Sequence, residues 1–316
     1  MFKSLFRPLL NAINFKQLEK TAEEGDPDAQ NKLGVMYHLG SYIPQDYKKA
    51  VYWYTKAANQ AHTQAEANLG EMYEYGLGIM RDDAKAVYWY TKAAQHGEVN
   101  AQNALGWMYE KGKGIEQDYV EAVNWYRKAA LQGDADAQYN LGVMYDAGRG
   151  VTRDYIQTLI WFRKSAEQGY APGQTSLGMM YAQGHGVSQD VRIALEWYQK
   201  AAAQGYVLAQ RLLGDYYETE KNIKKAIYWY LLAAQKGEST AQTNLGLMYG
   251  VGQDIMKNPI ISYALLEMAA ASGNETAQDI RYVIAKELNS DQIKEAHSLA
   301  KEPEELWKRI ESTVQD

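Results

Sequence analysis

The 316-residue sequence contains no cysteine, which excludes disulfide bonds, thiolate zinc sites and cysteine nucleophiles. It also lacks a basic excess, because 33 lysines and arginines stand against 39 aspartates and glutamates, giving a formal net charge of −6. This balance disfavours nucleic acid and anionic membranes as the main partners, since both need a basic footprint. No stretch reaches the ~18 apolar residues of a membrane span, so no integral membrane segment is expected.

The first residues, MFKSLFRPLLNAINF, resemble a signal peptide only superficially. Arg7 and Pro8 interrupt the apolar run, and no small-residue cleavage site follows. We therefore expect a cytoplasmic protein. A short amphipathic contact of residues 1–15 with a membrane surface is the alternative.

Phenylalanine is scarce: the chain has 4 Phe against 26 Tyr and 8 Trp. Such a bias suggests that one structural position has been copied, and the sequence does repeat. A Leu-Gly pair recurs every 36 residues, with one interval of 32, at Leu33-Gly34, Leu69-Gly70, Leu105-Gly106, Leu141-Gly142, Leu177-Gly178, Leu213-Gly214 and Leu245-Gly246. In phase with it runs a tryptophan, replaced by Leu265 in the last copy, at Trp53, Trp89, Trp125, Trp161, Trp197 and Trp229.

Each copy is predicted to form two helices. In the first copy, Ala29, Leu33 and Met36 share one face of a helix from about residue 28 to 38. The second helix, from about residue 46 to 60, begins after an Asp or Asn that fits an N-cap, at Asp46, Asp82, Asp118, Asp154, Asp190, Asn222 and Asn258. A glycine ends this helix in the other copies, whereas Ala61 stands there in the first, so that turn is expected to be strained or differently shaped.

The stretch Gly112-Lys113-Gly114 could be a phosphate-binding loop or a turn between the two helices. A phosphate loop needs Lys followed by Ser or Thr at a helix start, and no copy has that pair. The glycines instead fit residues with positive φ that end a helix. The glycine inside each first helix costs about 1 kcal/mol relative to alanine, so we expect a neighbouring helix or an aromatic ring to approach closely there.

A hairpin of this length cannot bury its apolar face alone, so the copies must stack into one continuous core. The predicted fold is all-α, a right-handed α-solenoid of stacked antiparallel helix pairs. Residues 1–26 would form an N-terminal capping helix and residues 275–316 C-terminal capping helices. The seven repeats between them are 27–62, 63–98, 99–134, 135–170, 171–206, 207–238 and 239–274.

The recurring A-x-x-x-L-G-x-M-Y, G-x-G-[IV]-x-x-D and A-x-x-W-Y-x-K-A-A segments resemble the Sel1-like repeat, a relative of tetratricopeptide repeats. Three departures are visible: Tyr42 replaces the second loop glycine of the first copy, the sixth copy lacks four residues and its glycine loop, and Leu265 loosens the seventh. The resemblance implies a scaffold or adaptor that binds another protein in its concave groove.

Positions three, seven and ten of the first helices, counted from their first Ala, would face that groove. They hold an apolar patch and an acidic row, and we expect them to bind a partner protein or peptide that offers an apolar or aromatic anchor and basic residues. The candidate binding residues are Trp107, Tyr139, Val143 and Met179 in the patch, Glu74, Glu110, Asp146 and Glu218 in the row, and Arg211. The alternative is that Trp107 folds back on its own repeat and the acids form a solvated face.

Catalytic and metal-binding patterns are weak. The five histidines are scattered, without H-E-x-x-H or G-x-S-x-G, so we expect no catalytic residue, metal site or cofactor. The predicted function is non-catalytic protein binding, either as an adaptor or as a bacterial neutraliser of a toxin or secreted effector. An enzyme or small-ligand binder that uses the groove carboxylates is the alternative from a different class.

Overall fold

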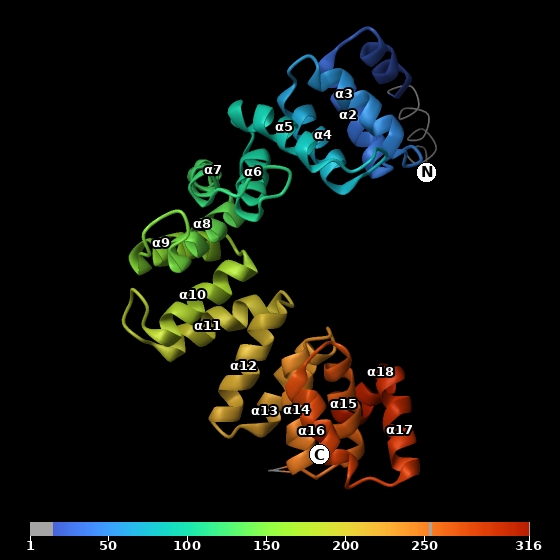
Figure 1. The fold of residues 1–316 in the computed structure, drawn as a ribbon, viewed down its shortest axis with the longest axis vertical. Helices are drawn as coiled ribbons and strands as arrows, with labels where there is room; N and C mark the ends of the chain where they lie inside the picture. The colour runs from blue at the N-terminus through green and yellow to red at the C-terminus, as the bar shows by residue number, and fades with distance from the viewer. Residues whose placement is uncertain (1–14, 253–254, 316) are drawn as a thin grey trace, which may run out of the picture. The chain divides into compact units, whose positions relative to one another are not determined.

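A computed structural model describes residues 15–252 and 255–315 (Figure 1). The predicted membrane contact of residues 1–15 lies, except for residue 15, outside these ranges. Within them the chain forms helices and turns and no strand, so the all-α prediction is confirmed. After a helix over residues 15–23, the helices are α2 (Pro27–Leu39), α3 (Tyr47–Ala58), α4 (Thr63–Tyr75), α5 (Asp83–Gln95), α6 (Val99–Lys111), α7 (Tyr119–Leu131), α8 (Ala135–Ala147), α9 (Tyr155–Glu167), α10 (Ala171–Gln183), α11 (Val191–Ala203), α12 (Val207–Thr219), α13 (Ile223–Ala234), α14 (Ser239–Val251), α15 (Pro259–Ala271), α16 (Glu275–Ala285), α17 (Ser290–Lys301) and α18 (Pro303–Gln315).

The chain divides into two compact units, residues 1–165 and 166–316. In the first unit each helix from α2 to α7 packs against the next one along the chain. In the second unit the same holds from α10 to α15, while α17 contacts α15, and α18 contacts α13, α15 and α17. Within each unit, successive helix pairs therefore stack as a solenoid requires, and even-numbered helices are the first helices of the repeats.

The predicted helix starts are confirmed. The side chains of the seven predicted N-cap residues accept hydrogen bonds from backbone N–H groups two or three residues later; Asp82, for example, accepts from Lys85 N at 3.0 Å. The predicted helix-ending glycines have positive φ, for example +88° at Gly97 and +98° at Gly133. Local capping chemistry therefore fixes the ends of each hairpin.

Ala61 adopts φ +59° at the turn between α3 and α4, where the corresponding turns have glycine. A left-handed conformation costs a residue with a Cβ about 1–2 kcal/mol, partly offset because glycine has more freedom in the unfolded chain. We predict that Ala61→Gly raises the free energy of unfolding by about 0.5–1 kcal/mol, measured by urea denaturation. Ala84→Gly, at an exposed site inside α5, should lower it instead; a loss of stability in both variants would show that the turn is unstrained.

In the first six repeats, the glycine inside the first helix faces a ring from the second helix of the same repeat; in the seventh, Gly246 faces Leu266 instead. A Cβ at Gly106 would lie 2.7 Å from Cδ1 of Tyr126, and one at Gly142 would lie 2.6 Å from Cδ1 of Phe162. The expected close approach is thus made by the residue that follows the tryptophan. Glycine allows the two helices of a hairpin to pack with a buried ring between them.

Buried glutamines join successive repeats. Gln102 on α6 donates through Nε2 to Ala94 O on α5 at 3.1 Å, and Gln132 after α7 donates to Gln102 Oε1 at 2.8 Å. The same pairing links Gln60 to Gln30 and Gln204 to Gln174. The second repeat carries Glu66 and His96 at these places instead, with Glu66 only 1% exposed and its Oε2 3.2 Å from His96 Nδ1.

A carboxylate at position 66 cannot donate to the backbone carbonyl as the glutamines do, and its burial is costly. We predict that Glu66→Gln raises the free energy of unfolding by about 1–2 kcal/mol at neutral pH, measured by urea denaturation. The reverse substitution Gln102→Glu should be destabilising. A loss of stability in Glu66→Gln would mean that the pair with His96 is worth more than the amide hydrogen bond.

Candidate functional site

The candidate residues of the first unit lie on α4, α6 and α8. We call the surface made by positions three, seven and ten of the first helices the first-helix face. Asn103 of α6 donates to Asp136 Oδ2 at 2.8 Å and accepts from Asn140 Nδ2 at 3.1 Å, so α6 and α8 lie side by side. Trp107 on α6 and Tyr139 and Val143 on α8 are therefore carried by adjacent helices.

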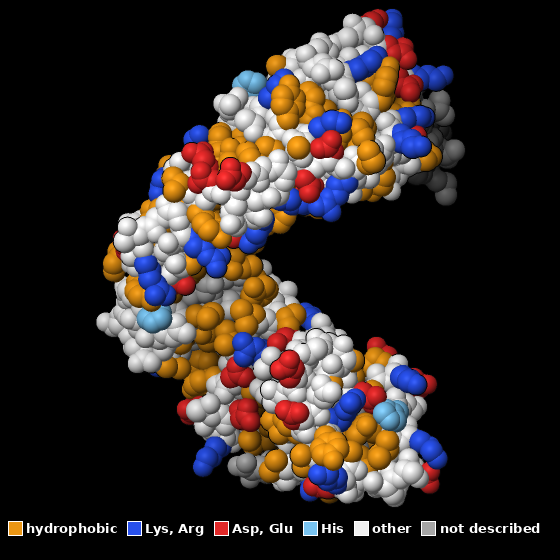
Figure 2. Space-filling view, in the orientation of Figure 1, with side chains coloured by type: hydrophobic (Ala, Val, Ile, Leu, Met, Phe, Trp, Pro, Cys, Tyr) orange, Lys and Arg blue, Asp and Glu red, His pale blue; other side chains and the backbone are white. Residues whose placement is uncertain are grey.

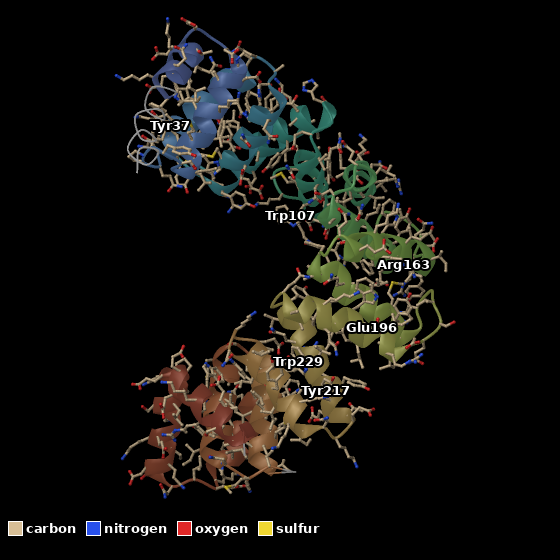
Figure 3. All side chains as sticks on the ribbon, turned by 180° about the vertical axis from the view of Figure 1, so that it is seen from behind. Tyr37, Trp107, Arg163, Glu196, Tyr217 and Trp229 are labelled. Atoms are coloured by element: carbon tan, nitrogen blue, oxygen red, sulfur yellow. The ribbon has the colours of Figure 1, made fainter. Side chains whose placement is uncertain are left out.

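Trp107 is half-buried (Figure 3). It packs against two apolar clusters, one formed by the second and third repeats and the other by the third and fourth repeats. The Lys113 Nζ lies 4.7 Å from the centre of one of its rings. The Trp107 ring is thus neither fully buried nor fully exposed. Its accessible part can contact a partner protein.

Tyr139 is also half-buried, and its ring stacks on Phe162 with centroids 5.7 Å apart and an interplanar angle of 26°. Phe162 stands where the second, third and sixth repeats have a tyrosine whose hydroxyl meets a carboxylate. Val143, one turn further along α8, is half-buried. The fourth repeat therefore presents an aromatic and aliphatic surface where the second and third repeats present a hydrogen-bonded acid.

The acidic row is less uniform than the sequence suggested. Glu74 is buried beneath its partners. Its Oε2 accepts from the Tyr90 hydroxyl at 2.9 Å, and its Oε1 lies 3.3 Å from Lys113 Nζ. Glu110 is half-buried and accepts from the Tyr126 hydroxyl at 2.9 Å. Asp146 is half-buried, and its carboxylate has no hydrogen-bonding or ion-pair partner among the described residues.

These hydroxyl–carboxylate pairs change the acid–base chemistry of the tyrosines. Burial, and then the charge of the adjacent carboxylate, raises the pKa of Tyr90 and Tyr126 well above the ordinary value. In the second unit the same causes raise the pKa of Tyr230, whose hydroxyl lies 2.7 Å from Glu218 and 2.8 Å from Asp215. Neutral tyrosines that hold carboxylates in place are structural elements of the face.

The remaining candidates belong to the second unit. Met179 on α10 is half-buried against the apolar cluster of that unit, and hydrophobic side chains gather over α10, α11 and α12 (Figure 2). Arg211 on α12 is paired with Asp215 at 2.5 Å, with Glu238 3.8 Å away, whereas Glu218 is exposed. Arg211 is thus held by its own neighbours.

Lys113 is the contributor that sequence reasoning missed. Its Nζ contacts Glu74, lies 4.0 Å from Asp83 and covers a ring of Trp107, so the residue between the loop glycines bridges the second and third repeats. The sequence did show that the residue between the two loop glycines varies from repeat to repeat, and Lys113 is that residue in the third repeat. Its role depends on the neighbouring repeat, which spacing within one repeat does not reveal.

The described residues contain no group of three or more His, Asp or Glu placed to hold a metal ion. What recurs on the first-helix face is aromatic, amide and carboxylate side chains. Among the described residues, no helix has the length and apolar character to cross a membrane.

Comparison with protein families agrees with this architecture. The family model of the Sel1 repeat matches residues 27–62, 63–98, 99–134, 135–170, 171–206, 207–238 and 239–274. The chain belongs to the Sel1 repeat family. Proteins built from Sel1 repeats are typically non-catalytic scaffolds for protein–protein interaction.

Among the crystal structures that are similar to this Sel1 repeat protein are two from bacteria. A Sel1 repeat protein from Oxalobacter formigenes is 34% identical, with a TM-score of 0.69, over 86% of this chain and 80% of that one. A protective antigen with an SLR fold, present in uropathogenic Escherichia coli strains, is 29% identical, with a TM-score of 0.61, over 94% of this chain and 81% of that one. No curated protein matches the sequence significantly.

Proposed function

We propose that this Sel1 repeat protein is a cytoplasmic, non-catalytic interaction protein that binds a partner protein or peptide on its first-helix face. The observation that carries the proposal is the half-buried Trp107 on α6 beside Tyr139 and Val143 on α8, in a place where other repeats have smaller or polar residues. Tryptophan and tyrosine are enriched among the residues that dominate binding energy. In the second unit, Met179 would supply a further apolar contact.

The partner's chemistry follows from the surface it meets. An apolar or aromatic anchor would contact Trp107, Tyr139 and Val143, and a basic residue would meet Asp146. Asp146 supports this, because its carboxylate is the one in the first unit's row that no tyrosine hydroxyl holds. Glu74, Glu110, Glu218 and Arg211 already pair with neighbouring side chains, so their proposed role is to shape the face.

The test compares partner capture by the wild-type chain and a Trp107→Ala, Met179→Ala variant, with affinity purification and mass spectrometry. Removing a central aromatic anchor costs 2 kcal/mol or more, so we predict a loss of affinity of about 30-fold. Helicity and the urea midpoint should change little more than in Trp89→Ala, a half-buried tryptophan on α5 outside the site. Unchanged capture by the double variant would refute the proposed site.

The identity of the captured protein decides between two roles within this class. A component of a regulatory complex would make the chain an adaptor, and a toxin or secreted effector would make it a neutraliser. Genes that neighbour the coding sequence offer an independent check, because a toxin or secretion gene beside it favours the neutraliser.

A further inference from the structure

A cavity of about 300 Å³ opens between α4 and α6 in the first unit. Asn68, Glu71 and Tyr75 line it from α4, Asn100 and Ala104 from α6, and Tyr90 reaches it from α5. It lies on the first-helix face and is separate from Trp107, which does not line it. The cavity therefore offers a second, differently built recess to the same partner.

The cavity exists because two small residues meet across the junction of the second and third repeats. Position three is alanine only at residue 67, where the other first helices carry Asn31, Asn103, Tyr139, Thr175, Arg211 and Thr243. Position four is alanine only at residue 104, where the others carry Lys32, Asn68, Asn140, Ser176, Leu212 and Asn244. Ala67 and Ala104 both line the cavity, so the recess is specific to this junction.

The cavity is lined by two carboxylates, those of Glu71 and Glu74, and no lysine or arginine is among the described residues that line it. Glu71 is half-buried and has no hydrogen-bonding or ion-pair partner among the described residues. Glu74 lies beside it, and Lys113, which pairs with Glu74, does not line the cavity. The charge of Glu74, burial and the charge of Glu71 raise the pKa of Tyr75.

We propose that this cavity binds an arginine side chain of the partner, an inference that rests on the proposed function of the first-helix face. The planar guanidinium matches a carboxylate with two parallel hydrogen bonds, which Glu71 can accept. Tyr75, whose side chain is 62% exposed at the edge of the cavity, offers a ring face for stacking. Lysine offers neither the planar fork nor the stacking surface, so arginine is the favoured occupant.

Asn100 adds a neutral acceptor at the rim. Its Nδ2 donates to Glu98 Oε1 at 3.0 Å, which leaves its Oδ1 for a guanidinium N–H. The small side chains of Ala67 and Ala104 leave room for the aliphatic part of an arginine, which would bury apolar surface there. Charge, shape and acceptors thus agree on one kind of side chain.

The experiment titrates the full chain, labelled at its alanine methyl groups, with N-acetyl-arginine amide and follows the Ala67 and Ala104 signals by NMR. N-acetyl-citrulline amide, which has the same shape without the charge, is the matched ligand control. We expect saturable shifts at both methyl groups with the arginine compound and none with the citrulline compound. Equal shifts with the two compounds, or no saturable shift with either, would overturn the proposal.

Two variants test the two physical requirements separately. Glu71→Gln removes the charge, and Ala104→Leu fills the cavity with the residue that Leu212 supplies at the same position of the sixth repeat. Each should weaken binding of the arginine compound about tenfold or more, read from the remaining cavity methyl signals. Glu116→Gln, at an exposed loop site of the same unit, should leave binding unchanged. Binding unaffected by both Glu71→Gln and Ala104→Leu would refute the site.

The outcome is separable from that of the proposed function. If the arginine compound binds but capture of a partner does not depend on Trp107, the cavity stands and the proposed function of the face fails. If capture depends on Trp107 and the arginine compound does not bind, only the cavity inference fails.

Discussion

Replacing Tyr126 with alanine is expected to lower the free energy of unfolding of the first unit by about 3–5 kcal/mol, the cost of removing a large ring from a core. Tyr126 is 0% exposed, and its ring lies against Gly106, so nothing larger than a hydrogen atom stands on that side to fill the space. The substitution also removes the hydroxyl that donates to Glu110. Urea denaturation followed by circular dichroism measures the loss.

Two matched variants show which part of the side chain matters. Tyr126→Phe keeps the ring and should cost only about 1 kcal/mol, the worth of one hydrogen bond; Phe162 shows that a phenyl ring fits against the equivalent glycine. Tyr88→Ala, on α5 and 52% exposed, should cost less than Tyr126→Ala by several-fold. If Tyr88→Ala were as damaging as Tyr126→Ala, burial against the glycine would not be the cause.

Raising the pH above about 10, the ordinary pKa of tyrosine, is expected to reduce stability steeply. The folded-state pKa of Tyr90, Tyr126 and Tyr230 is raised by burial and by adjacent carboxylates. These groups lose their protons more easily in the unfolded chain, so their contribution is fully present below pH ~10 and is lost as the pH rises toward the folded-state values. In that window each tyrosine lowers the free energy of unfolding by about 1.4 kcal/mol per pH unit, so the three together lower it by roughly 4 kcal/mol per pH unit.

Urea midpoints measured from pH 9 to about 11.5 would show this slope, and the near-ultraviolet phenolate band would show whether ionisation accompanies unfolding. A Tyr90→Phe, Tyr126→Phe variant removes two of the raised pKa values from the first unit, so its slope should be shallower. Burial also raises the pKa of Tyr198 to about 12, and this residue remains in the variant. An unchanged slope would place the alkaline transition on other groups.

Sequence reasoning was most successful where the cause is local. The N-caps, the glycines with positive φ and the strained Ala61 turn depend on residues a few positions apart, so spacing alone predicted them. The close approach at the first-helix glycines was also predicted, because a costly residue used seven times needs a reason. The helix pairs followed from the repeat itself.

The same reasoning failed where a contact joins residues far apart in the sequence. Helical rotation placed Glu74 toward the groove, yet Tyr90 of its own repeat and Lys113 from the following loop enclose it. The pairing of Glu66 with His96 across 30 residues likewise escaped notice. Rotation about one helix gives the direction of a side chain, whereas its burial depends on the neighbour that comes to meet it.

The glutamine pairs have a consequence for the evolution of the chain. Each pair joins two residues of one hairpin, 30 positions apart, and its companion hydrogen bond spans 8 positions to the preceding hairpin. No connection of this kind therefore reaches beyond the adjacent hairpin. A duplication or loss of one whole hairpin would therefore preserve these connections while changing which hairpins adjoin. The recess between Ala67 and Ala104 would vanish if any other copy were inserted between the second and third. A change in the number or order of hairpins would thus change which partner the chain binds, without a point mutation.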